Sequence, residues 1–403
     1  MNPTNPINNA LVAAFYKDHM HIVELIASHP RTDLQCLDDL DYSRLSKEAL
    51  DFVYSQFKAD GITRNQDAAN KVFAHALLNS GRTTIFSLMS IPYINWKNLD
   101  IIMSIPGNQM DILKGLMRHR ANPGAWNNAA IVYAARYNRE EPLRMLLRDS
   151  RVNPNDNGGL ALVEAIRFGY QDIVEILLDS PRVNPSVGDN HALYMAIKVG
   201  NNELVQRLME DPRVRTILKD SPRCVLCLAA ELKLKDTMRL LLSYKNDFSS
   251  KQIGDALVIA AKNGFTNTAG ILVKEGDANV AHVNNAPIRL AAKNGHESVV
   301  ERLLKDKRVN PGANHNEALI SASEQGYENV VRLLLHDPRV NPSDQENKAF
   351  LAAAKNGHLS IVYMLTKFQT VTHSPQIQTA IRLALENGHL QVFETIELFT
   401  TTV

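Results

Sequence analysis

Arg339-Val340-Asn341-Pro342 is the last of four copies of one tetrapeptide, and the spacing of these copies decides the fold. The other copies begin at Arg151, Arg182 and Arg308. The first two copies are 31 residues apart, and so are the last two. Self-similarity at a fixed period of this size is typical of proteins built from stacked structural repeats. The chain is therefore expected to be a series of repeats.

A second landmark marks the same phase, namely a glycine that follows an alanine by four residues. It occurs at Gly169, Gly200, Gly264, Gly295, Gly326, Gly357 and Gly388. A degenerate copy centred on Lys233 contains a two-residue insertion. Counting backwards, with one short step of 27 residues, places further landmarks at Asn138, Gly107, Ser80, Ala49 and Asp18. Thirteen units of 31 residues account for all 403 residues.

Each unit is predicted to contain two helices. In the copy around Gly357, we expect Asn347 to cap a first helix, and Gly357 to end it in the left-handed conformation that glycine adopts without steric cost. The apolar stripe of the first helix is Phe350, Ala353 and Ala354. The apolar stripe of the second helix is Leu359, Ile361, Val362 and Leu365. The segment Asp337–Pro342 contains two prolines and is expected to be an extended connection.

The repeats are not equally regular along the chain. Residues 1–95 are expected to form degenerate N-terminal repeats, and residues 122–375 regular ones. Residues 96–121 form a shortened repeat in which Pro106 precedes the landmark, so a bend there is one interpretation and an eroded repeat is the other. Residues 376–403 are expected to be a C-terminal capping repeat.

One stretch resembles a known family. Ala286–His296, followed by Val299–Leu304, is similar to the ankyrin repeat, and the resemblance recurs in Ala353–Leu365. The usual Thr-Pro of the first helix is replaced by pairs such as Glu317-Ala318, and the period is two residues shorter than in the family. The resemblance implies an all-α, ankyrin-type α-solenoid of about thirteen helix-turn-helix repeats, with hairpin fingers short or absent.

The resemblance also implies a function, which is non-catalytic binding of a partner protein on the concave repeat surface. The Asp-Pro-Arg-Val-Asn-Pro variety of repeat looks like those of protists, giant viruses and proteins that intracellular bacteria deliver into host cells. A host-directed scaffold or adaptor is therefore one interpretation. The alternative is an effector enzyme with a catalytic unit in the irregular N-terminal ~120 residues, a rough length set by where the repeats become regular.

Charge and composition exclude several classes of protein. The chain has 44 Lys and Arg against 43 Asp and Glu. That balance makes nucleic acid an unlikely partner, because binding to phosphates needs excess positive charge. No secretory signal or membrane-length apolar stretch is visible, and three cysteines do not make a disulfide framework. A cytoplasmic monomer without a cofactor or a metal is expected.

The chemistry-bearing residues are expected to be structural. Cys224 and Cys227 form a C-x-x-C. A redox pair would need a helix N-terminus in a thioredoxin-like setting, and a zinc site would need a second ligand pair, which the chain lacks. The two cysteines are therefore interpreted as small buried apolar residues. The histidines that directly follow landmark glycines are also expected to be structural. They are His296, His358 and His389. No phosphate-binding loop or nucleophile elbow is present, which favours a non-enzyme.

One surface position carries a pattern, at the end of each first helix. Ankyrin proteins bind partners along this edge. The basic residues there are Arg136, Arg167, Lys198, Lys262, Lys293 and Lys355. They predict a partner with an acidic or mixed patch, although a helix dipole favours cations at this position without any partner. Tyr137 and Phe168 are expected to face solvent beside Arg136 and Arg167, next to Trp126 in the preceding connection, so the contact surface is placed between Trp126 and Lys198.

Overall fold

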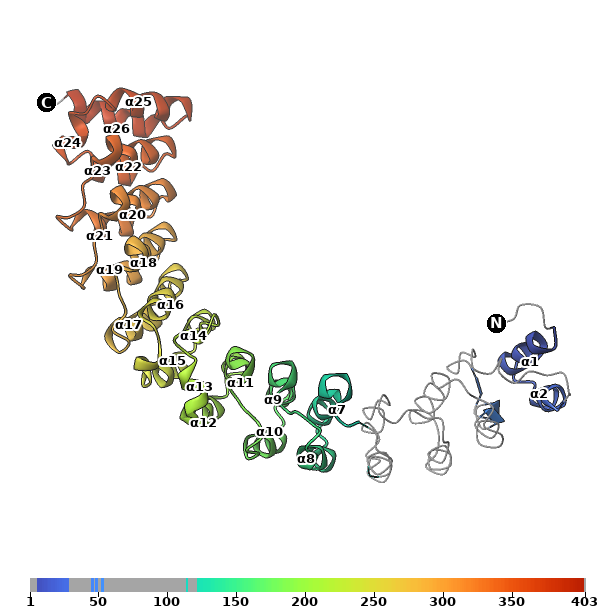
Figure 1. Ribbon diagram of the computed structural model, residues 1–403. Helices are drawn as coiled ribbons and strands as arrows, with labels where there is room; N and C mark the ends of the chain where they lie inside the picture. Colours follow the sequence, from blue (N-terminus) through green and yellow to red (C-terminus); the bar gives the residue numbers. More distant parts are fainter. Residues whose placement is uncertain are drawn as a thin grey trace. The chain divides into compact units, whose positions relative to one another are not determined.

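The computed structural model describes residues 6–28 and 122–401, together with positions 45–46, 48–49, 52–53 and 114. Across these residues every regular element is a helix and no strand is formed, so the predicted all-α class is confirmed. The chain divides into two compact units, residues 1–192 and 193–403, and each unit is described by itself. Figure 1 labels the helices.

The first unit contains helix pairs separated by tight turns. Its described helices are α1 (Pro6–Tyr16), α2 (Met20–Ala27), α7 (Ala125–Arg136), α8 (Glu140–Arg148), α9 (Asp156–Phe168) and α10 (Gln171–Leu178), followed by the first half of α11 (Val187–Lys198). Helix α1 packs on α2, α7 on α8, and α9 on α10 (Figure 1). Successive pairs also stack, because α7 contacts α9 and α8 contacts α10.

The second unit continues the same alternation of first and second helices. After the end of α11 it contains α12 (Asn202–Glu210), α13 (Pro212–Thr216), α14 (Val225–Glu231), α15 (Lys235–Leu242), the 3-10 turn η4 (Lys245–Asp247), α16 (Ser250–Lys262), α17 (Thr266–Lys274), α18 (His282–Lys293), α19 (Glu297–Leu304), α20 (Ala313–Gln325), α21 (Glu328–Leu335), α22 (Asp344–Lys355), α23 (Leu359–Leu365), α24 (Gln369–Thr372), α25 (Ile377–Glu386) and α26 (Leu390–Thr401). The first helices stack in a row, α14 on α16, α16 on α18, α18 on α20 and α20 on α22.

The core lies between and within the helix pairs, and alanine makes it compact. Ala291 and Ala292 of α18 are fully buried, as are Ala353 and Ala354 of α22. Such small side chains allow helices to approach closely, and the larger Val and Leu residues of the second helices fill the remaining space. Leu359 is an exception to the predicted stripe. It is 37% exposed, because it is the first residue of α23.

The seven landmark glycines end their first helices in the left-handed conformation, as predicted. Gly357 has φ 76°. The non-glycine landmarks inferred from register alone behave in the same way, since φ is 57° at Asp18, 56° at Asn138 and 60° at Lys233. The register is therefore confirmed at these positions.

The predicted landmark at Ala49 is wrong. Ala49 is a buried helical residue, and its backbone N–H donates to Oγ of Ser46 at 3.2 Å. This bond is typical of a helix start rather than a helix stop. The 31-residue step therefore does not hold between Asp18 and Ala49. The landmarks Ser80 and Gly107, the bend at 96–121 and the count of thirteen fall largely outside the described residues.

Aromatic rings give the landmark glycine a second role, because a ring of the next repeat lies on it. A Cβ atom on Gly295 would lie 2.7 Å from Cε1 of Tyr327, which is closer than atoms can pack. The histidines do the same and also donate hydrogen bonds. Nε2 of His358 lies 3.0 Å from the carbonyl oxygen of Glu324, and Nε2 of His296 lies 2.8 Å from that of Lys262. These histidines therefore join neighbouring repeats, as the structural interpretation predicted.

Four of the described connections between repeats are held by an Asp-x-Arg pair, and no hairpin strands occur in the connections that are described. In the last such connection, Arg339 donates from Nε to Oδ1 of Asp337 at 2.9 Å and from Nη2 to Oδ2 at 2.6 Å. The side-chain hydrogen bonds from Arg339 lower the pKa of Asp337. The same fork joins Asp149 to Arg151, and the guanidinium of Arg151 lowers the pKa of Asp149.

A buried asparagine ties the first helices α7, α18, α20 and α22 to the next connection. In α20, Oδ1 of Asn316 accepts a hydrogen bond of 3.0 Å from the backbone N–H of Asn341. Asn316 is the last of three successive left-handed residues that open this helix, with φ 54°. Asn347 occupies the equivalent position in α22, also with positive φ. The expectation that Asn347 caps its own helix is wrong, since its Nδ2 donates to the carbonyl oxygen of Val371, 24 residues later, at 3.3 Å.

We predict that Asn316→Gly costs more stability than Asn347→Gly. Glycine keeps the left-handed backbone in both variants, so the difference isolates the side chain. Asn316→Gly leaves the amide of Asn341 without its acceptor, and we expect a loss of about 1–3 kcal/mol in the free energy of unfolding. The Oδ1 of Asn347 is buried without a hydrogen-bond partner among the described residues, so the loss there should be smaller. Urea denaturation measures both, and equal losses would contradict the role of this asparagine.

We also predict that Asp337→Asn weakens the pH dependence of stability in acid. Because the folded state lowers the pKa of Asp337, the ion pair stabilises the protein above the unfolded pKa of about 3.9. That stability is lost as the pH falls through the folded value. Thermal unfolding between pH 5 and pH 2.5 should show a smaller decrease for Asp337→Asn than for the wild type. The control is Asp172→Asn, an exposed aspartate without this arginine fork, which should follow the wild type.

Candidate functional site

Two exposed aromatic side chains lie at the same position in successive repeats of the first unit. Tyr137 caps the end of α7 and is 47% exposed, and Phe168 ends α9 and is 49% exposed. Phe168 stacks on Tyr170, with ring centroids 5.9 Å apart, and Tyr137 lies 5.7 Å from Tyr133. The sequence-based expectation of exposure is thus met for both.

A buried carboxylate holds the two arginines beside these aromatic residues. Nε of Arg136 lies 2.8 Å from Oε2 of Glu164, and Nη1 of Arg167 lies 3.6 Å from Oε1 of the same residue. Glu164 is only 4% exposed, so its charge is stabilised by these two partners. The three groups together carry one net positive charge. Sequence analysis missed Glu164, although its spacing of three residues from Arg167 on one helix was a usable signal.

The arginines differ in how freely they meet solvent. The Arg136 side chain also lies over the ring of Tyr133, with the guanidinium carbon 5.7 Å from the ring centroid. Arg167 is 61% exposed, and its contact to Glu164 is the longer of the two. We call the surface formed by Arg136, Tyr137, Arg167 and Phe168 the α7/α9 surface. Arg136 is a fixed part of it, and Arg167 is its accessible positive charge.

The remaining predicted site residues are Trp126 and four lysines. Trp126 is the second residue of α7 rather than part of the connection, and its side chain is outside the described part of the chain. The predicted lysines belong to the second unit, where they end α11, α16, α18 and α22 with exposed side chains. They are Lys198, Lys262, Lys293 and Lys355.

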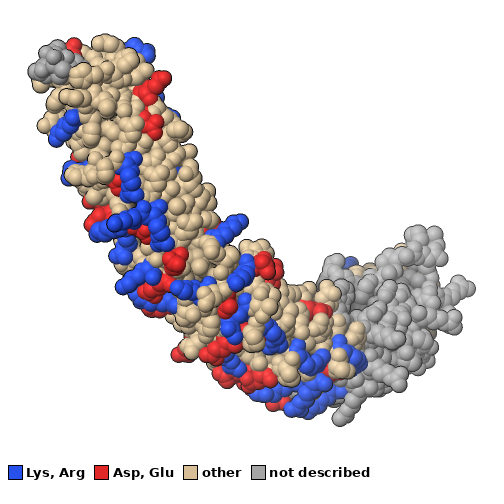
Figure 2. All heavy atoms as spheres, turned by 60° about the vertical axis from the view of Figure 1, so that its left-hand side comes forward, with Lys and Arg blue, Asp and Glu red and all other residues tan. Residues whose placement is uncertain are grey.

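The row of basic residues is interrupted in the second unit. Glu231, Glu324 and Glu386 occupy the equivalent position at the ends of α14, α20 and α25. Figure 2 shows Lys and Arg side chains interspersed with Asp and Glu over the described surface in view. A long row of positive charge is therefore not formed along these first helices, and the local chemistry of each repeat matters more.

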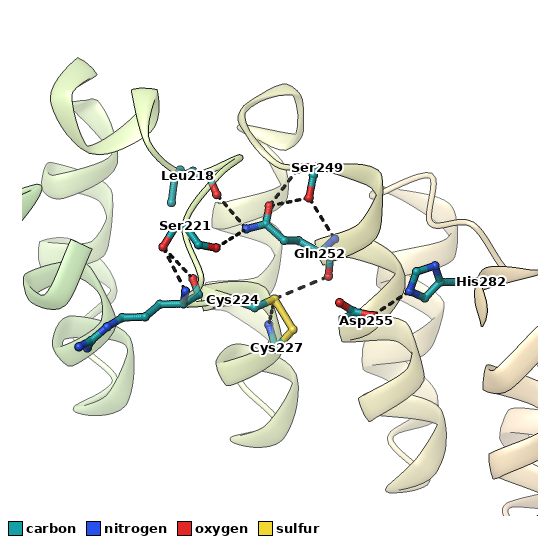
Figure 3. The surroundings of a disulfide bond; sticks show 9 residues. Leu218, Ser221, Cys224, Cys227, Ser249, Gln252, Asp255 and His282 are labelled. Atoms are coloured by element: carbon teal, nitrogen blue, oxygen red, sulfur yellow. Dashed lines mark hydrogen bonds and ion pairs between the residues drawn. A yellow bond between two sulfur atoms is a disulfide. The ribbon is translucent and has the colours of Figure 1, made fainter. Parts of the chain in front are cut away.

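The interpretation of Cys224 and Cys227 as small buried apolar residues is wrong. The two are joined by a disulfide bond, with Cα atoms 5.1 Å apart, and neither is fully buried (Figure 3). Cys224 is the N-cap of α14, and its Sγ accepts a hydrogen bond of 3.1 Å from the backbone N–H of Cys227. From the sequence, only metal binding and thioredoxin-like redox chemistry were considered for this pair.

A polar cluster surrounds the disulfide (Figure 3). Gln252 is buried and donates from Nε2 to the carbonyl oxygens of Leu218 at 2.8 Å and of Ser221 at 3.4 Å. On the same helix, Asp255 lies 2.7 Å from Nε2 of His282, whose ring packs over Gly254. No group of three or more potential metal ligands occurs among the residues that the structure describes.

Comparison with known proteins assigns the class that this architecture indicates, a protein of stacked helix-turn-helix repeats. The family model for ankyrin repeats (3 copies) matches residues 101–189, 193–284 and 257–346, which together are more than half of the chain. The chain belongs to the ankyrin-repeat family. No curated protein matches the chain.

Membership of this family defines the chain as a protein-protein interaction domain in a family that is generally non-catalytic. Within the described residues, no helix is both long and apolar enough to span a bilayer. The alternative of a catalytic unit within the N-terminal ~120 residues, a rough length taken from where the regular repeats begin, concerns residues that lie mostly outside the described ranges.

Proposed function

We propose that the protein is a non-catalytic scaffold that binds a partner protein through the α7/α9 surface. The observation that supports this most directly is the pair of half-exposed aromatic rings, Tyr137 and Phe168, at equivalent places in adjacent repeats. Large aromatic residues beside arginines are the side chains that most often contribute binding energy at protein interfaces. The ring contacts of Tyr137 with Tyr133 and of Phe168 with Tyr170 lie within their own repeats.

The surface is already arranged before a partner arrives. Glu164 fixes the guanidinium of Arg136, and Phe168 is held by stacking on Tyr170. Fixing these side chains in the free protein reduces the entropy that is lost on association. The surface therefore suits a partner that presents an apolar side chain to the rings and a carboxylate to Arg167. An acidic or mixed patch on the partner follows from the single net positive charge.

Polar residues replace these rings in most of the second unit. At the position of Tyr137 and Phe168, the repeats from α16 onwards carry Asn263, Asn294, Gln325, Asn356 and Asn387. Nδ2 of Asn263 donates to the carbonyl oxygen of Ile259 at 3.0 Å, and Nδ2 of Asn294 to that of Leu290 at 2.8 Å. These two amides are occupied within their own helices. Lys262, Lys293 and Lys355 are accordingly assigned weaker, electrostatic contacts.

The wider biological setting is also part of this proposal. A monomer in a cytoplasm is the state that fits the balanced charge, and the Asp-Pro-Arg-Val-Asn-Pro connections support a role as a host-directed effector. The division into degenerate, shortened, regular and capping repeats remains a prediction. An alternative partner class, nucleic acid, is disfavoured by the net charge of +1.

The test compares the wild-type chain with Tyr137→Ala/Phe168→Ala in capture of a partner, followed by measurement of affinity with the purified partner. We expect the double variant to bind at least about 30-fold more weakly, which corresponds to a loss of about 2 kcal/mol or more. The matched control is Tyr363→Ala on α23, because this tyrosine is 48% exposed but lies on a second helix. It should bind as the wild type does.

Two results would contradict the proposal. One is equal affinity of the wild type and the double variant, and the other is equal weakening by Tyr363→Ala. Circular dichroism of all three proteins should coincide, because the substituted side chains are about half exposed and contribute little to the core.

A further inference from the structure

The disulfide between Cys224 and Cys227 joins two residues of the same turn. It closes a loop with only two residues between the cysteines, so it removes less chain entropy from the unfolded state than a bond between distant segments would. The equivalent first helices α18, α20 and α22 begin without any cysteine. The repeat architecture therefore does not require this bond, and its function is sought in its chemistry.

Sγ of Cys224 has hydrogen-bond partners for both the oxidised and the reduced state. In the disulfide, Sγ of Cys224 accepts the hydrogen bond from the N–H of Cys227. The same N–H would stabilise a thiolate at Cys224 after reduction, since hydrogen bonding favours the charged form. Sγ of Cys224 also lies 3.7 Å from the carbonyl oxygen of Gln252. Only a reduced, protonated thiol can donate a hydrogen bond to that oxygen.

The cysteine pair contacts a segment that departs from the regular repeat. The connection after α13 carries the two-residue insertion, and Gln252 binds its carbonyl oxygens at Leu218 and Ser221 (Figure 3). Gln252 is itself fixed by Ser249, whose Oγ accepts from the Gln252 N–H in a capping box. Cys224 directly follows this connection and touches the backbone of Gln252. A change in the oxidation state of Cys224 therefore acts both on the connection that precedes it and on Gln252, which binds the same connection.

We propose that Cys224 and Cys227 form a reversible redox site that exchanges with external thiols and disulfides, and whose state sets the local stability of residues 218–228. This goes beyond the binding function proposed above and does not depend on it.

The exchange is a two-step reaction between the protein disulfide and two external thiols. A thiolate of the first thiol attacks Sγ of Cys227, a new sulfur–sulfur bond forms, and Cys224 leaves as a thiolate held by the N–H of Cys227. A second thiolate attacks the external sulfur of this mixed disulfide and expels Cys227. The two protons of the external thiols end on the two cysteines. The external thiols are oxidised to their disulfide, and the protein disulfide is reduced to a dithiol.

The first experiment follows the two cysteines in the intact, folded chain by mass spectrometry after alkylation. With excess dithiothreitol and no denaturant, we expect both cysteines to become fully alkylated. With glutathione disulfide in place of dithiothreitol, we expect both cysteines to become protected from alkylation. A second reduction should make both fully alkylated again. Limited alkylation of the reduced chain should modify Cys224 faster than Cys227, because its thiolate is the better stabilised one.

Hydrogen exchange then tests the coupling to the connection. Amides of residues 218–228 should exchange at least several-fold faster in the reduced than in the oxidised chain, while α20 should be unchanged as a control. Cys224→Ala/Cys227→Ala should abolish this dependence on reductant. This comparison stays valid even when the double variant is less stable, since each protein is compared with itself in the two conditions.

Three outcomes would overturn the proposal. A disulfide that resists dithiothreitol until the chain unfolds would be a permanent structural bond. If both thiols can still be fully alkylated after treatment with glutathione disulfide, no redox pair forms. Equal exchange of residues 218–228 in both oxidation states would show that the bond does not act on the connection.

Discussion

The hydrogen bond that a buried asparagine accepts from the backbone of the next connection is the interaction on which the rest of the structure depends. A helix pair of this size is not stable alone, so the contacts between neighbours decide whether the repeats form at all. Oδ1 of Asn128 accepts from the N–H of Asn153 at 2.7 Å, and Oδ1 of Asn285 accepts from that of Asn310 at 2.8 Å. Where Gly159 occupies this position, Asn155 binds the N–H of Asn184 instead. The bond fixes the register of each repeat against the next.

This arrangement leaves the ends of the first helices available for function. The core and the connections are used in stacking, and the landmark residue is fixed by its left-handed backbone and, from Gly264 to Gly357, by the ring of the next repeat. Tyr137 and Phe168 lie just before the landmark, and about half of each ring is exposed. The same position carries an amide in other repeats without loss of the fold. The proposed contact surface thus uses a position that stability constrains little.

Local conformation was predictable from the sequence because the repeat fixes it. The period placed helix stops at Asn138 and Lys233, which lack glycine, and both have positive φ. The same extrapolation was wrong at Ala49, where the sequence offers neither a glycine nor a tetrapeptide to fix the phase. Register is therefore predictable where the landmarks are dense and unreliable where they are replaced.

Interactions between repeats were harder to predict, since they depend on geometry in three dimensions. The sequence predicts that Asn347 is a local helix cap, but the left-handed turn directs its side chain to the following connection. In the sequence, Glu164 is a single charged residue in an apolar helix. In the structure, it is buried between arginines of two repeats. The pairing of Cys224 with Cys227 depends on the extended backbone at the N-cap, which spacing alone does not specify. The fold was thus more predictable than the site.

Hydrogen–deuterium exchange of the free chain and of its complex tests most directly whether a partner protein binds the α7/α9 surface. We predict slower exchange on binding at residues 133–139 and 164–170, which include the ends of α7 and α9. Helices α8 and α10 of the same repeats should exchange at unchanged rates. Protection confined to α8 and α10, or to repeats that lack the exposed aromatic residues, would contradict this mode of binding.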